Sequence, residues 1–157
     1  MKDRLGKLLA GPGSAVAHVD AQLAIVKAVE ARFSSALFEI RQLVQADLFD
    51  SELDAARSLL DHGYGRAAGA MAGVVLEHHL AEVCNAHQVA ISKKNPTIAD
   101  FNEALKSAGA IEVSQWRYIQ HLADIRNKCD HKKSADPSPA EVTDLVDGVA
   151  KIIKTVH

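Results

Sequence analysis

Apolar side chains recur at steps of three and four residues through the first third of the chain. The series is Val16, Val19, Leu23, Val26, Val29, Phe33, Leu37, Ile40 and Val44. An α-helix has about 3.6 residues per turn, so this spacing places the series on one side of a helix. Ser14, after Gly11-Pro12-Gly13, offers an N-cap. The pattern predicts an amphipathic helix over about residues 14–46, preceded by a flexible segment at 1–13.

Two further helices are expected before residue 88. Asp50 or Ser51 can cap the first of them, which ends at Gly63 and carries the apolar residues Leu53, Ala56, Leu59 and Leu60. The second runs from about Tyr64 to His87, and small residues fill its first half, from 67 to 73. Because small side chains let another helix approach closely, we expect this helix to be the centre of a bundle.

Capping patterns divide the rest of the chain into three helices. Asn95-Pro96 is a start signal for a short helix to Ala108, and Ser114 can start the next, which runs into a polar segment at 124–133. The sequence Ser138-Pro139-Ala140-Glu141 is a capping box with proline at the first helical position. Alternation typical of strands is absent from the sequence. The chain is therefore predicted to be an all-α, single-domain bundle of about five to six helices over 14–157.

Composition narrows the class of protein. The 157 residues are 48% hydrophobic but only 4% aromatic, which favours closely packed helices. The formal charge of -2 excludes a general basic field, so any contact with nucleic acid must come from a local patch. Neither a signal peptide nor a membrane span is indicated, and Cys84 and Cys129 lack metal-type spacing. We expect a cytoplasmic protein that does not associate with membranes and carries no metal or other cofactor.

The polar segment combines residue types that suit chemistry on a phosphodiester. Arg126 can hold a phosphate by two parallel hydrogen bonds, and His131 can transfer a proton near neutral pH. With Lys128, Lys132, Lys133 and Asp130, residues 126–133 carry a formal charge of +3. A basic cluster at the end of a helix also offsets the helix dipole, so a purely structural role stays open.

Geometry limits how the motif can work. On a regular helix Asn127 and His131 share a face, whereas Arg126 lies about 140° round from His131. The arginine and the histidine could therefore converge if the helix frays or tightens near His131, or if a second copy of the helix lies opposite.

The segment from Arg126 to His131 resembles the R-x(4–6)-H motif of the HEPN superfamily (higher eukaryotes and prokaryotes nucleotide-binding domains). A polar residue directly after the arginine, here Asn127, is typical of that motif. The helix of small residues from Gly65 to Leu80 is also similar to the central helix of bacterial HEPN-like proteins. The resemblance spans residues 14–156.

This resemblance implies a metal-independent endoribonuclease in which two motifs of a homodimer face each other. His131 would be the general acid or base, Arg126 would stabilise the charged phosphorane, and Asn127 would orient the histidine or the phosphate. Lysines could follow the RNA backbone, namely Lys128, Lys132 and Lys133 with Lys93 and Lys94. A role in prokaryotic defence or in a toxin system, with an antitoxin or regulatory protein as partner, goes with this class. The alternative is a non-catalytic module that binds a nucleotide, RNA or a protein.

Other polar residues are assigned supporting or structural roles. Glu77 is expected to pair with an arginine inside the bundle and to support the site, as Asp130 and His121 would. Arg66 is expected to reach the acidic helix before it. His78 and Glu82 share a helix face, but two ligands do not make a metal site.

Overall fold

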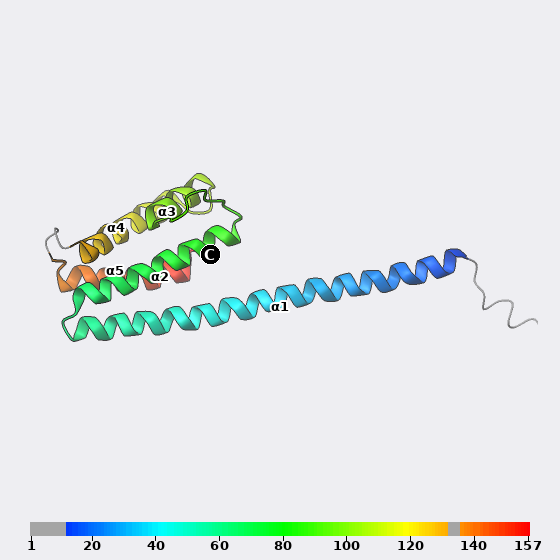
Figure 1. Ribbon diagram of the computed structural model, residues 1–157, viewed down its shortest axis with the longest axis horizontal. Helices are drawn as coiled ribbons and strands as arrows, with labels where there is room; N and C mark the ends of the chain where they lie inside the picture. Colours follow the sequence, from blue (N-terminus) through cyan, green and yellow to red (C-terminus); the bar gives the residue numbers. More distant parts are fainter. Residues whose placement is uncertain (1–11, 132–135) are drawn as a thin grey trace, which may run out of the picture. The chain divides into compact units, whose positions relative to one another are not determined.

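The computed structural model describes residues 12–131 and 136–157, and these residues form five α-helices and no strand. The helices are α1 (Pro12–Asp61), α2 (Gly65–Ala86), α3 (Ile98–Ser107), α4 (Val113–Asp130) and α5 (Pro139–Thr155), as labelled in Figure 1. The predicted all-α class is confirmed. Most of the segment expected to be flexible, 1–13, lies outside the described residues, but Pro12 and Gly13 already belong to α1.

The first helix is longer than the sequence predicted. We expected a break near Asp50 and Ser51, yet α1 continues to Asp61. The segment from Val44 to Leu53 contains no glycine or proline, so a capping residue alone does not end the helix. The contacts of the chain divide it within α1 into two units, of which residues 12–46 belong to the first and Asp47–His157 form the second.

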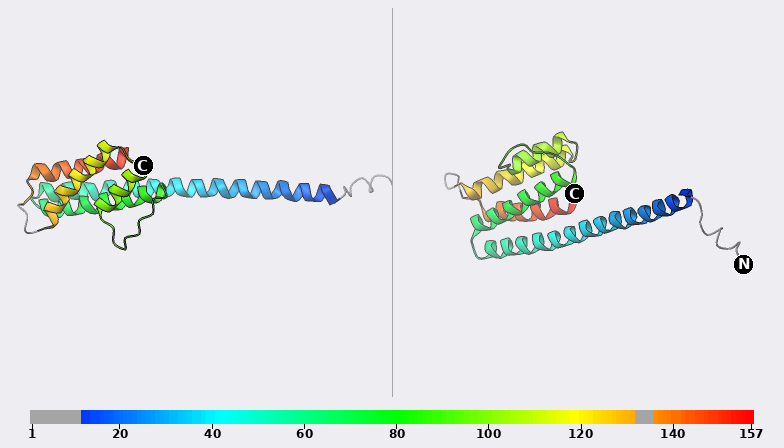
Figure 2. Two further views of the ribbon diagram at one scale, coloured as in Figure 1. Left: turned by 90° about the horizontal axis from the view of Figure 1, so that it is seen from above. Right: turned by 45° about the vertical axis from the view of Figure 1, so that its right-hand side comes forward.

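The second unit is a bundle built around α2. This helix packs against α3, α4 and α5, as expected for the central helix, and Figure 2 shows this packing from two further directions. Leu76 and Leu80 of α2 are fully buried. The core they share comes from every other helix of the unit: Leu53, Leu105, Ile119, Leu122, Leu145, Val149 and Ile152. Burial of this apolar surface is the main force that holds the bundle together.

Two helix starts differ from their sequence signals. Thr97, not Asn95, is the N-cap of α3, because Asp100 accepts hydrogen bonds from the Thr97 backbone N–H and hydroxyl, both at 2.7 Å. Glu112, two residues before Ser114, is the N-cap of α4. In both cases the residue three positions after the cap completes a capping box.

The start of α5 matches the prediction and is also linked to α4. Ser138 is the N-cap, and the Glu141 carboxylate accepts hydrogen bonds from the Ser138 backbone N–H at 2.8 Å and hydroxyl at 3.0 Å. The same carboxylate accepts a 2.6 Å hydrogen bond from Lys128 of α4. The Lys128 bond, followed by the Ser138 bonds, lowers the pKa of Glu141 from 4.5 to about 2.

Gly148 of α5 lies directly against side chains of α4. A Cβ at this position would lie 2.5 Å from Leu122 Cδ2 and 2.8 Å from the Tyr118 hydroxyl. Leu122 is fully buried, so neighbouring side chains limit how far it can shift. Gly65, by contrast, would place a Cβ no closer than 3.7 Å to any neighbour.

We therefore expect Gly148→Ala to lower the free energy of unfolding. Overpacking costs about 1–3 kcal/mol, which exceeds the gain of about 1 kcal/mol in helix propensity. The matched variant Gly65→Ala should leave stability unchanged or raise it by up to about 1 kcal/mol. Urea titration of the two variants and the wild type measures both effects. Equal stability of the two variants would contradict the packing at Gly148.

Acid should weaken the junction between α4 and α5. Because the folded state lowers the pKa of Glu141, its carboxylate stabilises the fold above about pH 4.5. This contribution is lost as the pH falls from about 4.5 to about 2. Glu141→Gln should remove that part of the pH dependence of unfolding in urea. Asp100, whose pKa is also lowered to about 2, should keep its own part, so the double variant with Asp100→Asn should show the flattest profile.

Candidate functional site

Arg126 lies across the central helix because α2 has no side chain at Gly73. A Cβ at Gly73 would overlap Cγ of Arg126 and lie 3.1 Å from its Nε. The Arg126 side chain is 26% exposed. The glycine thus seats the aliphatic part of the arginine on α2, and this fixes the place of the guanidinium.

Two carboxylates hold the guanidinium. Arg126 Nε lies 3.1 Å from Asp130 Oδ2, and Nη2 lies 3.9 Å from Glu77 Oε2. Nη1 also donates a long hydrogen bond of 3.4 Å to Asn127 Oδ1. Nε is buried and is not aligned to hydrogen bond with Asp130, so this contact is mainly one of charge. The ion pair expected for Glu77 is present, and its partner is the arginine of the motif.

His131 stands where α4 ends. The helix stops at Asp130, and His131 is its C-cap, with an extended backbone (φ -100°, ψ 112°) and an N–H that donates to Asn127 O at 3.2 Å. Its side chain is exposed and forms no hydrogen bond, ion pair or ring contact within residues 12–131 and 136–157. The amide of His131 therefore still belongs to the last turn of α4, and the chain leaves the helix directly after it.

Arg66 also reaches the motif, which the sequence did not predict. Its Nε donates to the carbonyl of Cys129 at 3.0 Å, and its Nη1 pairs with Asp136. Arg66 was expected to contact the acidic segment before α2, and this prediction is wrong, because its partners are Cys129 and Asp136. A cation on a terminal carbonyl of α4 complements the negative end of the helix.

The Cys129 side chain is enclosed between α4 and α2. A Cβ at Gly69 would overlap its Sγ, so this second glycine of α2 makes room for the thiol. Burial raises the pKa of Cys129, which keeps the thiol protonated. The side chain of Cys129 is thus part of the buried core.

Carboxylates balance the cations around the motif. Lys128, predicted to follow RNA, is bound to Glu141, and the pKa of the lysine is raised by this hydrogen bond. Lys132 and Lys133 lie outside the described residues. Among the described residues, the ion pairs around the end of α4 join three cations to four carboxylates: Arg66, Arg126 and Lys128 with Glu77, Asp130, Asp136 and Glu141.

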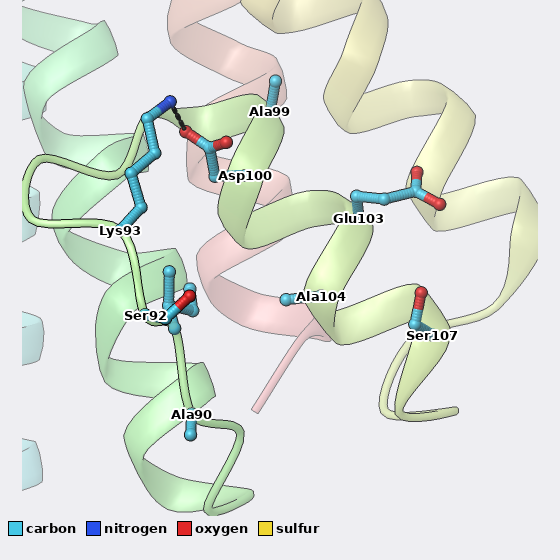
Figure 3. Close-up of a pocket in the computed structure, with 9 residues that line it drawn as sticks. Ala90, Ser92, Lys93, Ala99, Asp100, Glu103, Ala104 and Ser107 are labelled. Carbon is cyan, nitrogen blue, oxygen red and sulfur yellow. Dashed lines mark hydrogen bonds and ion pairs between the residues drawn. The ribbon is translucent and has the colours of Figure 1, made fainter.

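Lys93 and Lys94 are not next to the motif. They follow the C-terminal end of α2, whereas Arg126 contacts Gly73 in its first half. The helix from Gly73 to its end at residue 86 is about 20 Å long. Lys93 donates a 2.6 Å hydrogen bond to Asp100 of α3, and both residues line a pocket at the surface (Figure 3).

His121 also faces away from the arginine. Its Nε2 lies 2.9 Å from Asp144 Oδ2 of α5, while Arg126 lies on α2. The structure therefore brings Glu77 and Asp130 to Arg126 but leaves His121 on another side of α4.

The described residues were also compared with the requirements of a metal site and of a membrane-spanning helix. Within them no three His, Cys, Asp or Glu side chains are grouped to hold a metal ion, and no helix is long and apolar enough to cross a membrane. His78, considered above as a ligand, has its ring edge-to-face with Phe49, at a centroid distance of 5.4 Å.

Comparison with known proteins adds no relative. The chain matches no family model, no curated protein and no solved structure.

Proposed function

We propose that this chain is a metal-independent endoribonuclease of the HEPN type. The observation that supports it best is the exposed imidazole of His131, which has no partner among the described residues and follows an arginine fixed on the central helix. The role in prokaryotic defence or in a toxin system, controlled by a partner protein, rests on the resemblance of the motif alone.

The proposed reaction uses the ribose next to the scissile phosphate. His131 removes the proton of the 2′-hydroxyl, whose oxygen attacks the phosphorus and displaces the 5′-oxygen of the next nucleotide. A protonated histidine, supplied by His131 of the partner subunit, donates the proton that the leaving oxygen needs. Arg126 stabilises the extra negative charge of the phosphorane. The products are a 2′,3′-cyclic phosphate and a 5′-hydroxyl end.

The two carboxylates on Arg126 are compatible with this role. Ion pairs that stay accessible to water contribute roughly 0–1 kcal/mol, so exchange of Glu77 for a phosphate costs little. Glu77 is the more distant partner, at 3.9 Å, and is the carboxylate we expect a phosphate to replace. Asp130 then keeps the guanidinium in place.

A second candidate function is a binding module without catalysis. It is favoured by the ion pairs of Arg66, Arg126 and Lys128 with carboxylates, because a cation that is already paired attracts a long polyanion less strongly. Such a module would bind a nucleotide or a protein through the same residues and leave RNA intact.

Substitution of the motif histidine separates the two functions. Incubation with labelled RNA should give products that end in cyclic phosphate, and His131→Ala should lower the cleavage rate by about 10²–10⁴-fold. Arg126→Ala should have an effect of similar size, because a charge-stabilising donor is worth about 10²–10³-fold. His87→Ala is the matched control, since His87 is also an exposed C-cap histidine, and should cleave like the wild type. Cleavage that persists in His131→Ala disproves the site, and RNA bound but uncut favours the module.

A chelator tests whether RNA cleavage requires a metal ion. Treatment with EDTA should leave the cleavage rate within about twofold of the untreated protein, because protons and Arg126 carry the reaction. Removal of the chelator by dialysis, with and without added Mg²⁺, provides the control. Activity that is lost in EDTA and returns only with a metal would refute the mechanism.

A further inference from the structure

The first unit carries an exposed apolar seam along α1. Its positions follow one another at alternating steps of four and three residues from 19 to 44, and Glu30 is the one polar member. The apolar members are 49–65% exposed: Val19, Leu23, Val26, Phe33, Leu37, Ile40 and Val44. The seam extends for about 38 Å of helix.

The spacing of the seam indicates what covers it. Alternation of three and four residues is an average of 3.5, the repeat of helices that wind around one another as coiled coils. A helix that packs on a globular surface shows the straight-helix repeat of 3.6 and drifts from the seam by about 20° per heptad. Val29 and Leu43 flank the seam and are also exposed, which widens the apolar face. The partner of this face is therefore another helix of similar length.

We propose that this seam pairs with the same seam of a second copy of the chain, antiparallel to it. Residues 17–46 carry three acidic and three basic side chains, so the helix has no net charge and presents both signs to a partner: Asp20, Glu30 and Glu39 with Lys27, Arg32 and Arg41. A helix of this kind is complementary to itself rather than to a strongly charged protein or membrane.

Glu30 decides the orientation. In a parallel pair in register, both Glu30 carboxylates would meet in one apolar layer, where like charges repel in a medium of low polarity. In an antiparallel pair centred between residues 31 and 32, each Glu30 instead meets the partner's Phe33. The same register places Leu23 against the partner's Ile40, and Asp20 beside the partner's Arg41. One polar residue in a seam is a known means of fixing register at some cost in stability.

This interface does not depend on the ribonuclease proposal. It uses only residues 19–44, while the motif lies in the second unit. Because α1 continues to Asp61, an antiparallel pair directs the second units of the two copies to opposite ends, so this pair is not the one that would bring two His131 side chains together. The composite ribonuclease site needs a separate contact between copies, and each contact is tested by its own variants. Its new content is the surface of the dimer and the orientation of the two copies.

The size of the full-length protein in solution tests the dimer. Sedimentation velocity should show a dimer for the wild type, and Leu23→Glu with Leu37→Glu should weaken it by more than ~100-fold, because four buried leucines are lost per dimer. The matched double variant Ala21→Glu with Ala28→Glu changes the opposite face by the same charge and should stay dimeric. A monomeric wild type, or equal behaviour of the two double variants, overturns the proposal.

Cysteine cross-linking tests the orientation. The native Cys84 and Cys129 are buried, so the wild type should give no cross-link. Leu23→Cys and Ile40→Cys should each fail to cross-link alone, because an antiparallel pair sets like positions about 25 Å apart along the axis. A mixture of the two variants, one of them tagged, should give the mixed disulfide. Cross-linking of either variant by itself shows a parallel pair and overturns the antiparallel arrangement.

Discussion

The close contact of α4 with α2 at Gly69 and Gly73 is the constraint on which the rest of the second unit depends. Side chains from α4 occupy the space that β-carbons would need, so the two helices pack closely enough for Cys129 and Arg126 to lie on α2. Glycine inside a helix costs about 1 kcal/mol, and this cost is offset by the packing it permits. The register of the two glycines sets which α4 residues face the core and which remain at the surface.

That register explains why Arg126 and His131, which belong to one short motif, lie in two different environments. Arg126 is seated on α2 between carboxylates, whereas His131 lies beyond the last turn, with its imidazole in solvent. A charged group that is fixed and a titratable group that is exposed form a reasonable pair for work on a phosphate. Such work needs one rigid electrostatic element and one element that exchanges protons.

Local signals predicted the fold well, and long-range contacts account for what they missed. The capping box at Ser138 and the small residues of α2 are local patterns, and both predictions hold. The helix α1 continues past Asp50 and Ser51 because the helix propensity of this segment outweighs the capping preference of these residues. The contact of Arg66 with Cys129 joins residues that are distant in sequence, so no local pattern predicts it. In the candidate site, the charge pattern within 126–133 indicated a cationic patch. Glu77 and Glu141 come from other helices, so the sequence of residues 126–133 alone could not show that their carboxylates pair with Arg126 and Lys128.

The hydrogen bond between Lys128 and Glu141 has a consequence for the connection between α4 and α5. It joins the last turn of one helix to the first turn of the next and so closes the loop from outside. The entropic cost of closing a loop grows slowly with its length, by about 0.6 kcal/mol for each doubling. An insertion between the two helices should therefore cost little stability, because the bond between Lys128 and Glu141 keeps the ends of both helices together.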